Sequence, residues 1–229
     1  MLISLLTAAI APGLALLIYF YLKDKYEAEP VNMVIKLYVL GLIIVIPTVI
    51  LQHGFLLGFG ESKALFSFVI SGGIEECMKW LILYFIIYKH AEFDEPYDGI
   101  VYAVAASIGF ATLENVIFAV TQTSSFSDLL VRAFLPVSGH ALFGVIMGYY
   151  LGKAKFSQGT LVTKYLLYSL LLPILWHGIF DYILLVSKSF WVWFIVPFMI
   201  LLWIKGIWRV NLANAGSPSK PRVMGNYTE

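Results

Sequence analysis

The 229-residue sequence is poor in charged residues and has a single cysteine. Charged side chains make up 13% of the chain, about half the share found in soluble domains. One cysteine, Cys77, excludes an intrachain disulfide bond. The net charge of +1 gives no reason to expect nucleic acid as a partner.

Apolar residues make up 60% of the chain and fall into long blocks separated by short polar stretches. A helix of about 20 such residues crosses a bilayer. The sequence therefore predicts an all-α fold, a polytopic bundle of seven to eight transmembrane helices, with the eighth span left open in 121–140. The seven blocks run roughly over residues 2–22, 36–57, 64–88, 99–120, 133–151, 165–186 and 190–208.

The short connections leave no room for a soluble domain. Residues 1–210 are predicted to form one membrane-embedded domain, and the polar residues 211–229 a disordered cytoplasmic tail. The first block has no basic segment before it and is expected to be a permanent span rather than a signal peptide. Basic residues are concentrated on one side of the blocks, which predicts an outside N-terminus and a cytoplasmic C-terminus.

Charged residues lie in the middle of the third block, where each costs about 2.5–3.5 kcal/mol to insert. They are Glu75, Glu76 and Lys79. Helical spacing puts Lys79 within reach of both carboxylates, but one lysine neutralises only one of them. The other must be protonated or paired with another helix. A structural ion pair is the alternative, and it would need only one glutamate.

Further polar residues occur in the next three blocks. Glu114 and Asn115 stand in the fourth, which also has a stripe of small residues. In the sixth block, Asp181 follows His177 by four residues and so can fix the tautomer of that imidazole. A core histidine or a buried ion pair without chemistry is the alternative in each case. In the fifth block, His140 shares a helix face with Gly144, Gly148 and Gly152. The stripe of small residues in the fourth block consists of Ala103, Ser107 and Ala111.

These polar groups lie at similar predicted depths, in the outer half of the membrane at about 1.5 Å per residue. A shared, water-filled pocket explains a common depth, whereas independent ion pairs do not. Buried glutamate and histidine can activate water and protonate an amine, as peptide hydrolysis requires. Glutamate-activated water without a cofactor is expected. Zinc is the alternative, and its ligands would then be Glu76, His140, His177 and Asp181.

Several runs of the sequence together resemble the PrsW family of membrane proteases. The chain lacks the HExxH, GxGD and serine motifs of other intramembrane proteases. The resemblance covers nearly the whole chain and extends, at the level of motifs, to CAAX prenyl proteases and bacteriocin-processing membrane proteases. The runs are APGLALLIYFYLKDKYEAEP at 11–30, EECMKW at 75–80, HAEFDEPYDGIVY at 90–102, GFATLEN at 109–115, LPVSGHALFGVIMGYYLGKA at 135–154 and LWHGIFDY at 175–182.

This resemblance implies a CAAX-protease-like bundle in a bacterial cell membrane. It implies an endopeptidase that makes the first, extracytoplasmic-side cut in a single-pass anti-sigma factor under envelope or antimicrobial-peptide stress. A site-2 protease would cut next, and membrane lipids would be the other partner. Glu114 departs from the CAAX pattern, which has a histidine there. The matching motifs imply Glu75, Glu76, His140, His177 and Asp181 as catalytic groups. The hypothesis drawn from the residues adds Glu114 to the catalytic set, Lys79 to balance the second carboxylate, and Asn115, with His140, as a candidate for the oxyanion contact.

Interpretations from other classes remain open at the level of sequence. Intramembrane Glu, His and Lys also mark proton paths in transporters, although no matching halves are visible in this chain. A non-catalytic immunity or chaperone-type membrane protein is the other alternative, since such proteins would keep the bundle without cleaving a substrate.

Overall fold

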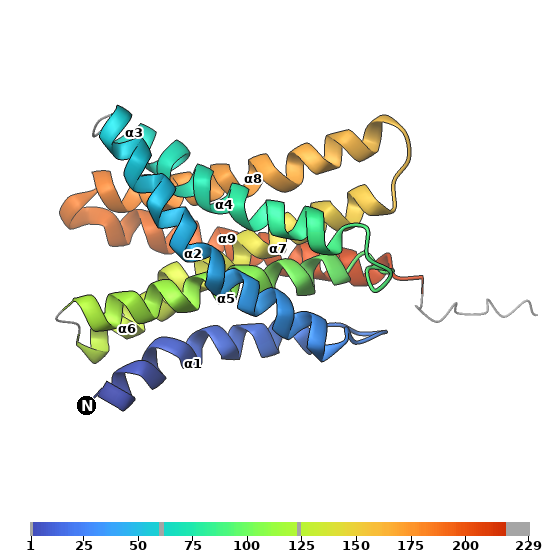
Figure 1. The fold of residues 1–229 in the computed structure, drawn as a ribbon, viewed down its shortest axis with the longest axis horizontal. Helices are drawn as coiled ribbons and strands as arrows, with labels where there is room; N and C mark the ends of the chain where they lie inside the picture. Colours follow the sequence, from blue (N-terminus) through green and yellow to red (C-terminus); the bar gives the residue numbers. More distant parts are fainter. Residues whose placement is uncertain (1, 60–61, 123–124, 219–229) are drawn as a thin grey trace, which may run out of the picture.

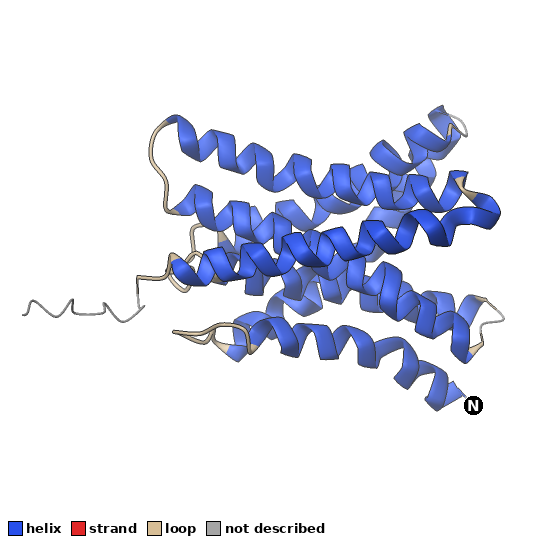
Figure 2. Ribbon diagram, turned by 180° about the vertical axis from the view of Figure 1, so that it is seen from behind, coloured by secondary structure: helices blue, strands red, loops and turns tan. Residues whose placement is uncertain are grey.

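The computed structural model describes residues 2–59, 62–122 and 125–218, and these residues form helices and loops without a strand (Figures 1 and 2). Six helical runs are long and apolar enough to cross a bilayer. The predicted multi-pass helical bundle is thus confirmed. In chain order the elements are α1 (Leu2–Tyr21), α2 (Val31–Phe59), α3 (Lys63–Leu65), η1 (Phe66–Ser71), α4 (Gly72–Ile82), η2 (Leu83–Ile87), α5 (Asp98–Thr121), α6 (Phe126–Arg132), η3 (Ala133–Val137), α7 (Ser138–Lys155), α8 (Thr160–Val186), η4 (Lys188–Phe190) and α9 (Trp191–Ala215).

The third predicted block is a seventh helical run. It extends without a break from Lys63 to Ile87, through α3, η1, α4 and η2, where η1 and η2 are π-helical. The charged residues at its centre lower its hydropathy. The run nevertheless lies alongside the other helices of the bundle (Figure 1). Seven helical columns therefore make up the described part of the chain.

Two boundaries differ from those expected. Residues 126–155 form a single helical run through α6, η3 and α7, so the polar start of this run belongs to the fifth span and is not an eighth. Helix α9 continues to Ala215, so the predicted tail begins later than residue 211. Residues 219–229, the rest of that tail, lie outside the described residues.

Helices α5 and α7 form the interior of the bundle. Every residue of α5 from Asp98 to Thr112 is buried, and so is every residue of α7 from Ser138 to Tyr149. Helices α1, α2, α8 and α9 surround this pair (Figure 1). Each of them carries exposed apolar side chains. A bundle with so much apolar surface outside suits a lipid surrounding.

Glycine allows α5 and α7 to approach each other closely. A Cβ atom at Gly148 of α7 would overlap the carbonyl group of Gly99 in α5. A Cβ atom at Gly144 would press on Ser107 and on the Ala103 carbonyl. The predicted glycine face of one helix thus meets the predicted small-residue stripe of the other.

The chain enters and leaves the bundle at opposite ends (Figure 1). The N-terminal end is the one at which α1 begins, and the C-terminal end is the one at which α9 ends. The connections 22–30 and 88–97 lie at the C-terminal end, as the alternating direction of the seven columns requires.

We expect Gly148→Ala to destabilise the protein by about 1–3 kcal/mol, because the added carbon meets backbone that has no rotamer to change. Thermal unfolding of the purified protein in detergent, followed by tryptophan fluorescence, measures this. The control is Gly54→Ala in α2, where no atom lies within 4 Å of the added carbon. Equal melting temperatures for the two variants would show that the α5–α7 contact is looser than described.

Candidate active site

Helix α4 places the side chains of Glu75, Glu76 and Lys79 in the interior of the bundle because it approaches α8 closely. A Cβ atom at Gly72 would lie 3.0 Å from the backbone nitrogen of Gly178 and 3.3 Å from the Cβ of His177. The preceding π-helical turn η1 sets the rotation of α4, and such turns are frequent at functional sites. Glu75 and Glu76 therefore face α8 rather than lipid.

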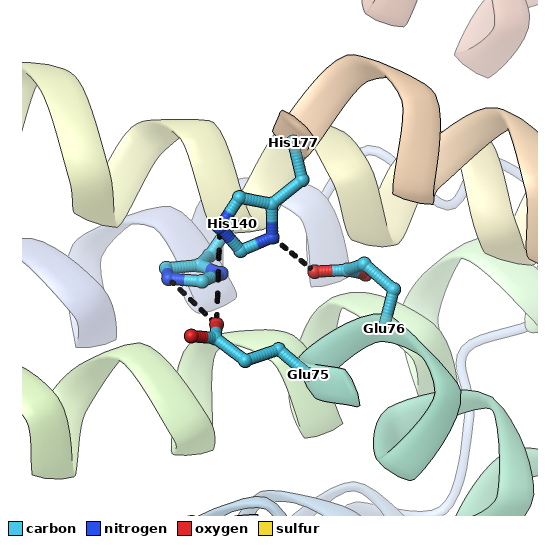
Figure 3. A group of neighbouring side chains, drawn as sticks. All are labelled: Glu75, Glu76, His140 and His177. Atoms are coloured by element: carbon cyan, nitrogen blue, oxygen red, sulfur yellow. Dashed lines mark hydrogen bonds and ion pairs between the residues drawn. The ribbon is translucent and has the colours of Figure 1, made fainter. Parts of the chain in front are cut away.

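His177 is oriented by Glu76. Its Nδ1 lies 2.9 Å from Glu76 Oε1, and because a carboxylate accepts, the ring donates its Nδ1–H (Figure 3). The lone pair of neutral His177 is then on Nε2, which faces Glu75 Oε2 at 3.8 Å. The sequence predicted that Asp181 would control this tautomer. Its Oδ2 reaches only Nε2, at 3.5 Å, since it lies one turn along the same helix.

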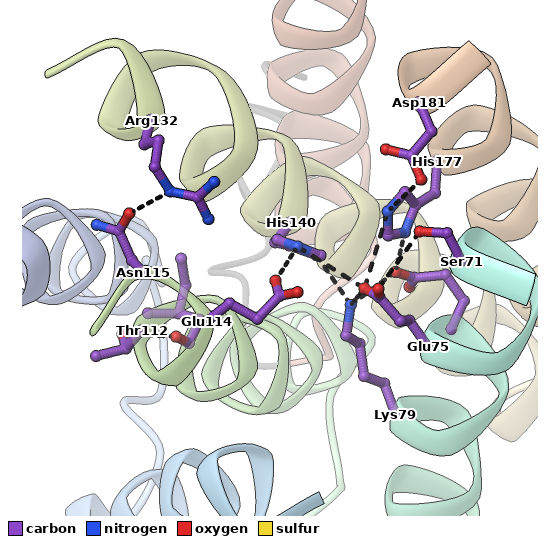
Figure 4. Close-up of polar contacts among 12 residues, drawn as sticks. Ser71, Glu75, Lys79, Thr112, Glu114, Asn115, Arg132, His140, His177 and Asp181 are labelled. Atoms are coloured by element: carbon purple, nitrogen blue, oxygen red, sulfur yellow. Dashed lines mark hydrogen bonds and ion pairs between the residues drawn. The ribbon is translucent and has the colours of Figure 1, made fainter. Parts of the chain in front are cut away.

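His140 is held between two charged groups from other helices. Lys79 Nζ lies 2.9 Å from its Nδ1, and an ammonium only donates, so Nδ1 accepts. The Nε2–H then donates to Glu114 Oε2, also at 2.9 Å (Figure 4). Lys79 donates at the same time to Glu76 Oε1, at 2.8 Å. Lys79 and Glu76 therefore fix both imidazoles from their Nδ1 sides.

Glu75 is held at one oxygen and left open at the other. Its Oε1 accepts a hydrogen bond from Gln52 Nε2 at 3.0 Å and another from Ser71 Oγ at 3.4 Å. Its Oε2 has no hydrogen-bond partner among the described residues and lies 3.8 Å from His177 Nε2 and 4.0 Å from His140 Nε2. Three reactive atoms thus face one another (Figure 3).

Gln52 and Ser71 did not emerge from the sequence as site residues. Gln52 is half-buried on α2, and the available signal was an amide side chain inside an apolar block. The same block holds His53, which is exposed. His90 is also exposed, at the C-terminal end of the bundle. Both histidines lie apart from the site.

Asn115 does not join the site. Its Nδ2 donates to the Ala9 carbonyl at 2.8 Å, and its Oδ1 accepts from Arg132 Nε at 2.7 Å (Figure 4). The amide therefore links α5 to α1 and α6, and the expected oxyanion contact does not fit. The other predicted residues do converge, from four helices: Glu75, Glu76, Lys79, Glu114, His140, His177 and Asp181.

The site has more carboxylates than cations. Within the described residues, Lys79 is the one lysine or arginine whose nitrogen lies within 4.0 Å of them. Glu76 and Lys79 side chains are fully buried, whereas those of Glu114 and Asp181 are 29% and 18% exposed. Buried charge of one sign requires a partner or a metal. Three buried carboxylate oxygens without hydrogen-bond partners remain: Glu75 Oε2, Glu76 Oε2 and Asp181 Oδ2.

The donor set fits a metal ion. One atom each from Glu75, Glu76, His140 and His177 lie within 4.8 Å of one another. The zinc ligands expected from sequence included Asp181 where this group has Glu75. Two imidazoles and carboxylates are ordinary zinc ligands. The Nδ1–H bond from His177 to Glu76 is also the arrangement that commonly stands behind a zinc-bound imidazole.

Comparison with known proteins agrees with this chemistry. The model of the PrsW family, described as intramembrane metalloproteases, matches residues 29–204. A protease PrsW of Bacillus subtilis (strain 168) is 46% identical over 213 residues, covering 93% of this chain and 96% of that protein. The protease PrsW of Clostridioides difficile (strain 630) is 34% identical over 218 residues, covering 92% and 89%. No solved structure matches the chain.

The description of the family as metalloproteases agrees with the zinc alternative that the sequence left open. The match spans more than half of the chain and reaches from the loop before α2 into α9. It includes each of the helices that carry the converging side chains. This chain belongs to the PrsW family of intramembrane metalloproteases.

Proposed function

We propose that the protein makes the first, extracytoplasmic-side cut in a single-pass anti-sigma factor of a bacterial cell membrane, upstream of a site-2 protease. The resemblance of the sequence to the PrsW family supports this substrate. The basic residues support an outside N-terminus and a cytoplasmic C-terminus. Glu114 stands much nearer Thr121, at the N-terminal end of the bundle, than Asp98, so the depth of the site agrees with a cut on the outer side.

The observation that carries the hydrolytic part is the meeting of Glu75 Oε2 with the Nε2 atoms of His140 and His177. The opposite ends of all three side chains are fixed by hydrogen bonds. Such fixed groups need no reorganisation when charge develops in a transition state. In the reaction, water oxygen bonds to the carbonyl carbon, the C–N bond breaks, and the amine takes a proton.

These three side chains are also the ones that would hold a zinc ion, with Glu76 behind His177. His140 would bind the ion through Nε2 after giving up the proton that this atom donates to Glu114. A bound zinc ion supplies a water of lowered pKa and polarises the peptide carbonyl. It would also offset the excess of carboxylates around Lys79. The sequence alone favoured glutamate-activated water, whereas the charge excess and the family description favour the metal.

Glu114 is the carboxylate best placed to move protons. It is the most exposed of the carboxylates in the site and already lies 2.9 Å from an imidazole nitrogen. It accepts a proton from water and returns it to the leaving amine. Lys79 donates a hydrogen bond to Glu76, and Glu76 keeps the lone pair of His177 directed at the reacting groups.

Coexpression with a tagged single-pass anti-sigma factor tests the substrate and the site together. We expect a product cut on the extracytoplasmic side with the unchanged protein and none with a Glu75→Ala, Glu76→Ala double variant. Glu114→Gln should slow cleavage by about 100-fold or more. The control is Glu92→Gln, an exposed acid at the C-terminal end. Persistent cleavage by the double variant would exclude the site.

Metal dependence is measured on purified protein in detergent. We expect one bound zinc ion per chain, loss of proteolysis on treatment with a chelator, and recovery on adding zinc. His177→Ala should lose the ion, whereas His90→Ala, at an exposed histidine far from the site, should retain it. Full activity in protein that has been shown to be free of metal would leave glutamate-activated water as the mechanism.

Gln52→Leu removes the hydrogen bond to Glu75 Oε1 while keeping the size of the side chain. We expect kcat to fall by about 10- to 100-fold with KM little changed, because the lost group orients a reacting carboxylate. Gln52→Asn, which keeps the amide, should recover part of the loss. The control is His53→Gln at the exposed neighbour. Unchanged kcat in Gln52→Leu would remove Gln52 from the proposal.

A further inference from the structure

A second group of carboxylates lies at the C-terminal end of the bundle. Asp24 and Glu29 come from the connection between α1 and α2, and Asp98 is the first residue of α5. One carboxylate oxygen from each lies within 4.8 Å of the other two. Asp98 and Glu114 are separated by about 24 Å along α5 at ~1.5 Å per residue, so this acidic group is distinct from the active site.

The acidic group is buried and only partly satisfied. Asp98 is fully buried and Glu29 is 5% exposed. Asp98 Oδ2 accepts the backbone N–H groups of Asp94 and Glu95 at 2.8 and 2.6 Å. The Glu29 and Asp98 carboxyl groups lie close enough to share a proton in a hydrogen bond. When both are ionised, Asp98 Oδ1 has no donor among the described residues, and Asp24 Oδ2 has none in either case.

Glu95 is an independent indication of a missing ligand. Its side chain is 2% exposed, and neither carboxylate oxygen finds a hydrogen-bond donor in the described part of the chain. It lies close enough to Asp24 for the two carboxylates to repel each other. A fourth buried acid, without a hydrogen-bond donor among the described residues, therefore lies near Asp24 of this group.

Among the described residues, no basic side chain forms a salt bridge with these acids, and Lys155 interacts with Asp98 only at longer range. Within residues 2–59, 62–122 and 125–218, every salt bridge within 4.0 Å belongs to the active site. Lys155 donates instead to the His90 carbonyl at 2.8 Å and lies over the Phe93 ring. Buried carboxylates are otherwise found paired with cations or bound to metals.

We propose that Asp24, Glu29 and Asp98, with Glu95 beside them, bind a hard divalent cation, Mg²⁺ or Ca²⁺. All the available ligands are oxygens, the set that these two ions prefer and that differs from the imidazole-containing active site. Two hydroxyl groups hold Glu29 in place. Tyr21 donates to its backbone carbonyl at 2.9 Å and Tyr102 to its Oε2.

Binding would join the connection 22–30 to the start of α5. Three helices, α1, α2 and α5, would then be tied together at the end of the bundle that the basic residues assign to the cytoplasm. The expected consequence is stability rather than chemistry, because the site lies far from the reacting groups.

The test uses the full chain carrying His140→Ala, purified in detergent and treated with chelator, so that active-site metal does not contribute. Saturating Mg²⁺ or Ca²⁺ should raise the melting temperature by about 5 °C or more. Titrating each ion separately shows which binds at lower concentration. Tb³⁺ is a second probe, because nearby tyrosines sensitise its luminescence and the bound natural ion should displace it.

Glu29→Gln and Asp98→Asn should abolish both the shift and the Tb³⁺ signal, and Glu92→Gln, at an exposed acid of the same end, should retain them. If a buried substitution prevents folding, Asp24→Asn at the half-buried position should show the same loss. Two outcomes would overturn the proposal. One is the absence of any shift with either ion. A Glu29→Gln variant that is more stable than the parent in the same ion-free buffer would then assign the group to a proton shared between Glu29 and Asp98. The other is an equal shift in the substituted proteins.

Discussion

The contact between the Lys79 ammonium and Glu76 is the interaction on which the rest of the site depends. Both side chains are fully buried in the middle of the helical run from Lys63 to Ile87, and their charged atoms are 2.8 Å apart. Without Lys79, Glu76 would be a charge with no compensation. The same ammonium binds His140, and the same carboxylate oxygen binds His177. One buried ion pair therefore positions imidazoles from two other helices, and each imidazole turns its Nε2 toward Glu75.

Backbone geometry decides where these groups meet. Glycines at the α4–α8 and α5–α7 contacts remove the side chains that would keep the helices apart. Helix α4, which carries Glu76, and helix α7, which carries His140, each begin directly after a π-helical turn. In η3, Pro136 lacks the N–H that a regular ladder would use. Such turns rotate the following helix, and here the rotation points Glu76 and His140 inward.

Helical spacing within single segments of the chain made part of this structure predictable from the sequence. Spacing of this kind predicted the helical spans, the glycine face of α7 and the reach of Lys79 to both glutamates. The similar depths of the polar residues predicted that four helices converge. Partners across helices were not predictable in the same way. Whether Glu76 or Asp181 fixes the His177 tautomer depends on the rotation of α4, which its π-helical turn sets. Asn115 was predicted to support the site from its position beside Glu114, but its amide is bonded to Ala9 of α1 and Arg132 of α6. Gln52 is recognisable only once α2 lies beside α4.

Two groups of buried carboxylates lie at different depths of the bundle, and their negative charge is compensated in different ways. Near the N-terminal end, carboxylates share space with an ammonium and two imidazoles, a set that can exchange protons and hold a borderline metal. At the other end, the carboxylates have hydroxyl and backbone donors but no cation within the described residues. Proton-exchanging groups suit a reaction, whereas oxygen ligands alone suit a fixed ion. The separation along α5 allows the first set to change charge during catalysis without disturbing the second.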